Sequence, residues 1–206
     1  MSSVVEICNL ALDHLGLARI SSIDEAGAPA QRCKLQYDYA RDFVLSKHHW
    51  GFARGLQVLA ENVTNDRRTK WAYSYAQPSD LLTIRYIVPS IEGAASNSFL
   101  YGVMQEGQEL WVPFDAEAGN IYCDVSPATL IYTKRIEDAT KFPSLVTDAI
   151  AAYLAFRIAM PLTRDRSLRS DAQTIFMQTM AAATTWDANQ IKNTSDAQSD
   201  FVAQRS

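Results

Sequence analysis

Hydrophobic residues recur every three or four positions at both ends of the chain, which is the spacing of a helix with one buried face. The first such stretch covers residues 4–17, where Gly16 is placed to end a helix. The second begins at Pro29, because a first helical turn tolerates a missing N–H, and it extends to Lys47. A short loop joins the two, so we expect them to pack antiparallel. Their apolar positions are Val4, Ile7, Ala11 and Leu15, then Cys33, Tyr37, Ala40 and Val44.

Helical spacing returns after Pro143. Ser144 is suited to cap a helix that continues to Ile158, and Pro161 is expected to end or kink it. A last helix carries side chains alternately four and three residues apart, which predicts a seam against another helix. The seam positions are Leu168, Ala172, Ile175, Thr179, Ala182 and Trp186.

The middle of the chain, from Phe52 to Arg135, changes to a hydrophobic period of two, which indicates strands. Turn-forming pairs such as Glu92-Gly93 and Gly119-Asn120 separate the alternating stretches. We therefore predict five to seven short antiparallel strands. The alternating residues are Leu56, Val58 and Ala60; Leu82, Ile84, Tyr86 and Val88; Phe99, Tyr101 and Val103; Ile121, Cys123 and Val125; and Ala128, Leu130 and Tyr132.

This order of elements predicts an α+β protein in which an antiparallel bundle of about four helices carries an inserted antiparallel β-sheet or small barrel. Residues 1–50 and 143–190 form the discontinuous helical domain, and residues 51–142 form the inserted β domain. Residues 191–206 are polar and are expected to form an extended tail. Trp50 and Phe52 lie where helix changes to sheet, so we expect them to pack in the core and to fix the angle between the two parts.

Composition and charge narrow the classes of function. The chain has 48% apolar and 20% charged residues and lacks the run of about eighteen apolar residues that a membrane span needs, so we expect no membrane association. A net charge of -4 argues against general binding of nucleic acid through a basic surface. The N-terminus lacks the features of a secretory signal, which predicts synthesis in the cytoplasm. Three separated cysteines, Cys8, Cys33 and Cys123, are expected to be buried.

Catalytic and cofactor motifs are missing from the sequence. It contains no GxxxxGK[ST], GxGxxG, GxSxG or HExxH pattern, so we expect no cofactor and no catalytic residue. His48 and His49 point about a hundred degrees apart on a helix, and His14 is the one other histidine, so we expect no metal site. The histidine pair is more typical of a helix C-terminus.

Two groups of charged residues remain as candidates. Asp115, Glu117 and Asp124 lie among the strands and are the residues on which acid–base catalysis would depend. Arg164, Arg166 and Arg169 cluster where the last helix starts, and they suit contact with an acidic partner or a phosphate. In the polar tail, Phe201 and Val202 form the one apolar pair and are candidates for anchoring the tail on a partner.

Five segments, taken in order, resemble one known family. Together they are similar to the tail tubular protein A and related head-to-tail adaptor or connector proteins of tailed bacteriophages. Members often have Pro-Trp followed by Asn-Phe where this chain has His49-Trp50-Gly51-Phe52, and the tail after Lys192 has no counterpart. The segments are EICNLALDHLGLARISSIDE at 6–25, YDYARDFVLSKHHWGFA at 37–53, WAYSYAQPSDLLTI at 71–84, TKRIEDATKFPSLVTDAIAAYLA at 133–155 and MPLTRDRSL at 160–168.

The resemblance implies a structural subunit of the virion with no catalytic residues. Such subunits assemble as a ring, expected to hold twelve copies, at the head-to-tail junction. The expected partners are further copies of the chain, the portal protein on one side and a downstream tail or nozzle protein on the other. DNA would pass through the lumen during ejection without specific binding.

Two other readings stay open at this point. One is a virion-associated hydrolase that cleaves cell-envelope polysaccharide with loop carboxylates such as Asp115 and Glu117. The other is a regulatory binding module of a host cell. Turnover would indicate the hydrolase, and binding to virion proteins would separate the adaptor from the regulatory module.

Overall fold

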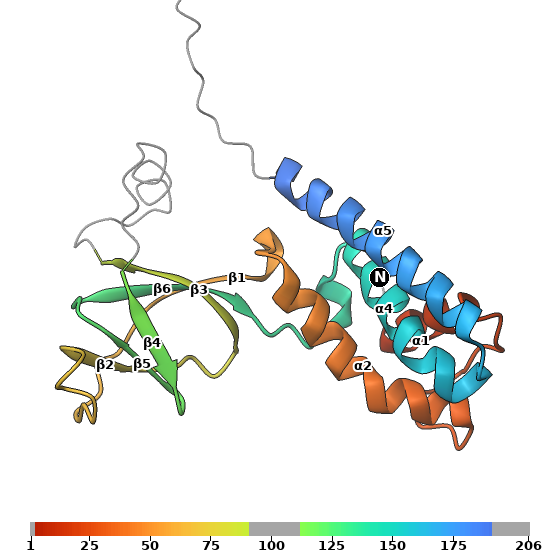
Figure 1. Cartoon of the computed structure of the whole chain (residues 1–206), viewed down its shortest axis with the longest axis horizontal. Helices are drawn as coiled ribbons and strands as arrows, with labels where there is room; N and C mark the ends of the chain where they lie inside the picture. The colour runs from red at the N-terminus through yellow and green to blue at the C-terminus, as the bar shows by residue number, and fades with distance from the viewer. Residues whose placement is uncertain (1–2, 91–111, 191–206) are drawn as a thin grey trace, which may run out of the picture.

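The computed structural model describes residues 3–90 and 112–190 and has an α+β fold (Figure 1). Four α-helices and two three-stranded antiparallel sheets make up these ranges, with all strands between the second and third helices. The predicted strand around Phe99, Tyr101 and Val103 and the tail with Phe201 and Val202 lie outside the described residues. The helices are α1 (Val4–Asp13), α2 (Ala28–Lys47), α4 (Ser144–Thr163) and α5 (Arg166–Gln190), with 3-10 turns η1 (Gly51–Ala53) and η2 (Ala139–Lys141).

The α1 helix shows how local sequence sets the element boundaries. Ser3 and Glu6 form a capping box, in which the Glu6 N–H donates to Ser3 Oγ at 3.1 Å and the Ser3 N–H donates to Glu6 Oε2 at 3.2 Å. The helix ends at Asp13, and the chain then turns to Gly16, whose φ of +66° suits glycine. The helix is thus shorter than the predicted range 4–17, and residues 14–16, expected to be helical, form a turn.

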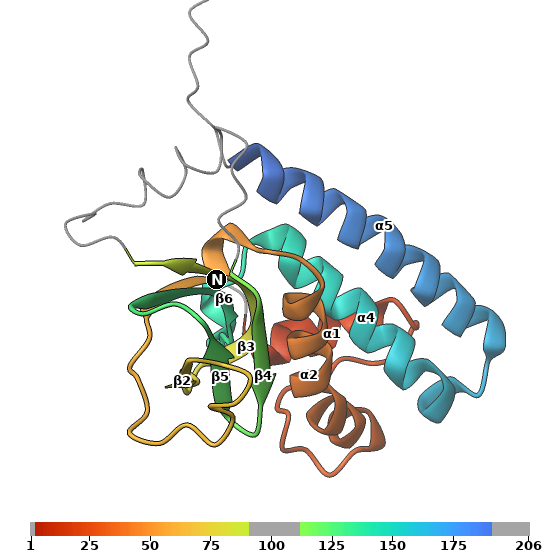
Figure 2. The same cartoon turned by 60° about the vertical axis from the view of Figure 1, so that its left-hand side comes forward.

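The α4 helix lies at the centre of the helical part, in contact with α1, α2 and α5 (Figure 2). Among the described helices, α4 is the one that is long and apolar enough to cross a membrane. However, 61% of its apolar segment is buried inside the fold. Its start differs from the prediction, because Pro143 is the N-cap and Ser144 is the first helical residue. The helix also continues past Pro161 to Thr163, and Arg164 then ends it in the left-handed conformation.

The α5 helix buries a different row of residues from the predicted seam. Ala182, expected in the seam, is exposed, and Trp186 is half-buried. The predicted seam keeps the 3.6-residue repeat of a helix, but after Ala172, which belongs to both rows, it runs one residue before the residues that are buried. The residues that α5 buries are Ala172, Phe176, Ala183 and Asp187.

The strands form two sheets instead of one, and neither closes into a barrel, so the small-barrel alternative is wrong for the described residues. Residues 124–127 carry the chain from one sheet to the other. A small hydrophobic core joins residues of both, including Tyr75 and Ile121 of one sheet with Leu130 and Tyr132 of the other. The first sheet has the order β1 (Arg54–Val58), β6 (Ala128–Lys134), β3 (Leu81–Pro89), and the second has the order β2 (Tyr73–Ala76), β5 (Asn120–Cys123), β4 (Phe114–Glu117).

Gly55 is required where β1 crosses the ring of Tyr132 on β6. A Cβ atom on Gly55 would lie 2.5 Å from the ring carbons, and the ring cannot swing aside easily because the Tyr132 O–H donates to Asp80 Oδ1 at 2.8 Å. Close approach of backbone to ring is therefore built into this strand pair.

We expect Gly55→Ala to lower the free energy of unfolding by about 1–3 kcal/mol through overpacking. Chemical denaturation followed by circular dichroism measures the change. Gln57→Ala, on the same strand but exposed, is the control and should change stability by less than about 0.5 kcal/mol. Equal effects of the two substitutions would mean that the Tyr132 ring moves freely.

Candidate interaction surface

The junction between helices and sheets is built around Trp50, which is fully buried. Its indole N–H donates to Val44 O at 3.1 Å, so the ring is tied to the last turns of α2. Phe52 is half-buried, and its ring centroid lies 6.0 Å from that of Trp50 and 6.4 Å from that of Phe142. These two aromatic residues link α2 to the segment that precedes α4.

A buried carboxylate from the far end of the chain closes the same junction. Asp187, near the end of α5, accepts hydrogen bonds from the Gly51 N–H at 3.0 Å and pairs with His48 Nε2 at 3.0 Å. Its side chain is only 3% exposed. An Asp in a polar helix end is usually solvated, so the sequence did not predict this contact. His48 and Asp187 together hold the end of α5 against the end of α2.

Arg85 of β3 satisfies the other side of this junction. Its guanidinium donates to Thr133 Oγ1 at 2.8 Å and to the carbonyl oxygens of Ser46 and His48. Cations near a helix C-terminus stabilise carbonyl groups that have no partner within the helix. A residue of the sheet therefore caps the end of α2. The cation Arg85 and the carboxylate of Asp187 both stabilise the junction.

His49 lies beside this network in a partly buried position, with its ring edge-on to Tyr86 at a centroid distance of 6.0 Å. Its Nε2 atom is buried and has no hydrogen-bond partner among the described residues. Burial, followed by the nearby cations Arg85 and Arg54, lowers the pKa of His49 to about 4. The imidazole is thus held neutral at physiological pH.

The three arginines proposed for partner contact occupy different positions around the turn between α4 and α5. Arg164 adopts φ +56° at the end of α4 and Arg166 begins α5; both are exposed. Asp165 caps α5, accepting from the Ser167 N–H at 2.7 Å. Arg169 lies over the ring of Phe156, with its Cζ atom 4.8 Å from the ring centroid. Of the three, Arg169 is the one held over a ring of α4, and Arg164 and Arg166 lie at the turn itself.

Arg169 belongs to a larger surface that we call the aromatic–cation face. It consists of three cations, each placed over an aromatic ring on the outside of α2, α4 and α5. Besides Arg169, Lys47 Nζ lies 4.7 Å from the centroid of Phe43, and Arg157 Cζ lies 4.5 Å from that of Tyr39. Cations over ring faces are attracted by the ring quadrupole, which pre-orients them. The face is thus defined by Tyr39, Phe43, Lys47, Phe156, Arg157 and Arg169.

The rings of this face continue into the core. Phe43 stacks on Tyr153 of α4 at a centroid distance of 4.2 Å, and Tyr153 contacts Phe176 of α5 at 4.9 Å. Towards solvent, Tyr39 remains 51% exposed, and Leu35, one turn before it on the same helix, is 65% exposed. The face therefore presents apolar area beside its cations, on a rigid base.

The three cations of the face form no ion pair, unlike eight other lysines and arginines of the described residues. Lys34 pairs with Asp24 and Arg67 with Glu117, and similar pairs hold further lysines and arginines. Within residues 3–90 and 112–190, no carboxylate forms an ion pair with Lys47, Arg157 or Arg169. Arg157 is instead positioned by Gln36 Oε1, to which it donates at 3.1 and 3.2 Å. Positive charge is left available to a partner here.

The three candidate catalytic carboxylates each have a structural partner. Asp115 accepts from Lys70 Nζ at 2.6 Å and from Trp71 Nε1 at 2.8 Å, and the bond from Lys70, then that from Trp71, lowers the pKa of Asp115. Glu117 pairs with Arg67, and Asp124 accepts from the Ala72 N–H at 2.9 Å. A general acid needs a raised pKa, which is opposite to the shift at Asp115.

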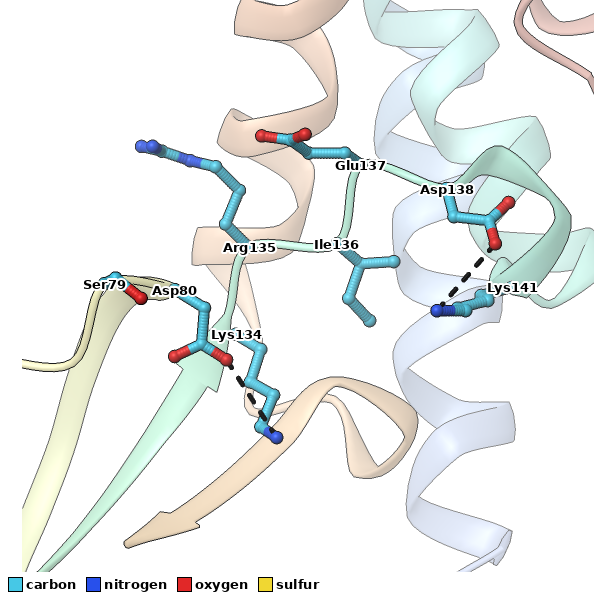
Figure 3. A pocket seen from close by; sticks show the side chains of 8 residues that line it. All are labelled: Ser79, Asp80, Lys134, Arg135, Ile136, Glu137, Asp138 and Lys141. Atoms are coloured by element: carbon cyan, nitrogen blue, oxygen red, sulfur yellow. Dashed lines mark ion pairs between the residues drawn. The ribbon is translucent and has the colours of Figure 1, made fainter.

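A polar pocket of 480 Å³ lies where β6 leads towards η2 (Figure 3). Four of its charged side chains pair with one another, Lys134 with Asp80 at 4.0 Å and Lys141 with Asp138 at 3.8 Å, and Arg135 pairs with Asp42 of α2 at 3.1 Å. Three cations and three carboxylates line it, so it carries no net charge and offers no distinct ligand chemistry. Its lining residues are Ser79, Asp80, Lys134, Arg135, Ile136, Glu137, Asp138 and Lys141.

No protein-family model matches this chain, and no curated protein matches it. In the described parts of the chain, His, Cys, Asp and Glu side chains do not gather in threes as a metal site would require. The cysteines Cys8, Cys33 and Cys123 are buried and free. The aromatic–cation face is therefore the feature on which a functional argument can be built.

We expect Asp187→Ala to lower the free energy of unfolding by about 1–3 kcal/mol, because it leaves the Gly51 N–H without its acceptor. Thermal or urea denaturation measures the change. Asp171→Ala, an exposed position on the same helix, is the matched control and should have little effect. Stability unchanged in both variants would show that water replaces the carboxylate at no cost.

His49 makes stability depend on pH in a defined window. Its pKa in the folded protein, about 4, is below its ordinary value of 6.5, so the unfolded chain binds more protons between these values. Stability is therefore complete above pH 6.5 and is lost as the pH falls towards 4. The free energy of unfolding, measured by urea denaturation at several pH values, should therefore change less steeply with pH in His49→Gln than in the wild type. His14→Gln, at an exposed position, should keep the wild-type slope.

Proposed function

We propose that this chain is a structural subunit of the head-to-tail junction of a tailed bacteriophage virion. Copies of it assemble into a ring of twelve that joins the portal protein to the tail and continues the DNA channel. In this role α1, α2, α4 and α5 form the antiparallel bundle of the subunit, and the β part or the tail at residues 191–206 faces the downstream tail protein. The subunit catalyses no reaction.

The aromatic–cation face is the observation that carries the proposal. Its rings pack on the outside of the helical core, and it combines exposed apolar area with cations that form no ion pair within the described residues. Protein interfaces are enriched in aromatic residues and arginine, which is the composition of this face. A ring built from one kind of subunit also needs two different surfaces that fit each other, and an outward face of this kind can serve as one of them.

The five segments that resemble adaptor proteins fall on elements that set the geometry of the subunit. They cover α1 and its following loop, the end of α2 with η1, β2 with the start of β3, the passage from β6 into α4, and the turn between α4 and α5. Junctions of this kind determine how helices and sheets are oriented. The resemblance thus concerns architecture, and it supports a structural role.

The charge distribution is compatible with a DNA conduit. The net charge of -4 disfavours tight binding of phosphates along a channel wall, so DNA can pass through the lumen. The carboxylates considered for hydrolysis, Asp115 and Glu117, are engaged with Lys70 and Arg67. Both observations favour the adaptor over a hydrolase of cell-envelope polysaccharide.

Negative-stain microscopy and solution mass, measured on the purified chain alone and mixed with portal protein of the same phage, test the proposal. We expect rings in the mixture, and class averages will give their symmetry. Portal protein mixed with an unrelated acidic protein of similar mass is the control. A chain that stays monomeric in both samples and does not bind portal contradicts the adaptor, and directs attention to a regulatory host-cell module.

A further inference from the structure

We propose that the aromatic–cation face binds a carboxylate-bearing segment of a partner protein. Glu or Asp side chains of that segment would pair with Lys47, Arg157 and Arg169, while its apolar side chains would cover Leu35 and Tyr39. This inference rests on the proposed function, in which the chain acts by binding proteins, and it names the chemistry of the partner.

Charge complementarity is the first reason for a carboxylate ligand. The protein carries more acids than bases, and its own carboxylates form ion pairs with eight other lysines and arginines of the described residues. Cations left unpaired on one face of such a protein are available to acids from outside. Arg157 and Arg169 also present planar guanidinium groups, which suit two-point hydrogen bonding to a carboxylate.

The rings beneath the cations are the second reason, because they reduce the cost of binding. Each long side chain is already held over a ring, and Arg157 is additionally held by Gln36. Less side-chain freedom is therefore lost when a ligand arrives. The rings also keep water from one side of each cation, which strengthens its attraction for a carboxylate.

A protein segment suits this face better than a nucleic acid does. Affinity for a nucleic acid backbone depends on neutralising many phosphates along a continuous basic path, and the face offers three cations separated by rings in an acidic protein. The exposed Leu35 and Tyr39 instead call for apolar side chains on the ligand. Aromatic rings and arginines are typical of the residues that dominate protein interfaces.

Fluorescence anisotropy with the full-length protein tests this directly. The probe is a labelled peptide of about twelve residues with a repeated Glu-Glu-Leu sequence, short enough to lie across one helical face. A peptide with Gln in place of every Glu tests the need for charge, and a labelled DNA duplex of similar length tests phosphate.

The key variant is Arg157→Gln/Arg169→Gln, and Arg19→Gln/Arg68→Gln is the matched control, because it removes the same charge at exposed positions outside α2, α4 and α5. We expect the Glu peptide to bind the wild type, and its Kd to rise about tenfold in the key variant and less than about twofold in the control. The Gln peptide should bind at least about tenfold more weakly than the Glu peptide. Both variants should unfold at the same temperature as the wild type to within a few degrees.

Three outcomes overturn the inference: no binding of the Glu peptide, equal loss in both variants, or stronger binding of DNA that depends on Arg157 and Arg169. The test is separate from that of the adaptor. Rings with portal in the absence of peptide binding would reject this partner chemistry and keep the adaptor. Peptide binding without rings would keep the face and reject the adaptor.

Discussion

Burial of α4 is the constraint on which the rest of the molecule depends. Its small and apolar side chains, including Ala151, Ala152 and Leu154, let three other helices approach it closely. Small residues shorten the distance between helix axes, so the neighbours are fixed in position by van der Waals contact. Everything on the outer face of the helical part, including the spacing of the ring–cation pairs, follows from how α2 and α5 rest on this one helix.

The junction near Trp50 solves a second problem, the joining of two parts with different periodicities. Where the chain leaves α2, the carbonyl groups of Ser46 and His48 and the N–H of Gly51 have no hydrogen-bond partner within a helix or a sheet. Arg85 of β3 supplies donors, and Asp187 of α5 supplies an acceptor, so three distant segments meet at one point. Buried polar groups that are fully paired in this way specify a unique arrangement, because any other would leave charges unpartnered.

The types of element could be predicted from the sequence, since the change of hydrophobic period near Phe52 and again after Pro143 matches the change from helix to strand and back. The division into two sheets could not, because strand pairing depends on contacts between distant segments. The burial of Asp187 was not predicted either. The predicted seam on α5 runs one residue before the buried row at Ala183 and Asp187, so it gave the buried position to Trp186.

Prediction of the candidate site was partial for the same reason. Arg169 was singled out by its cluster in the sequence, but Phe156 beneath it lies on another helix, and no local pattern announces that pairing. The same holds for Arg157 of α4 with Tyr39 of α2, whereas Lys47 and Phe43 are four residues apart on α2, a spacing that is visible in the sequence. The sequence predicted where charged residues cluster. Which of them lie over aromatic rings depends on how the helices pack.

The aromatic–cation face is divided among three helices, and under the proposed binding role this ties recognition by a partner to correct folding. No single helix carries the whole set of cations, so a chain in which α5 has come away from α4 cannot offer Arg169 in place. A partner that contacts all three cations at once would bind only when the three helices are packed correctly. In the proposed role, recognition on such a surface would act as quality control, because only correctly folded subunits would bind the partner.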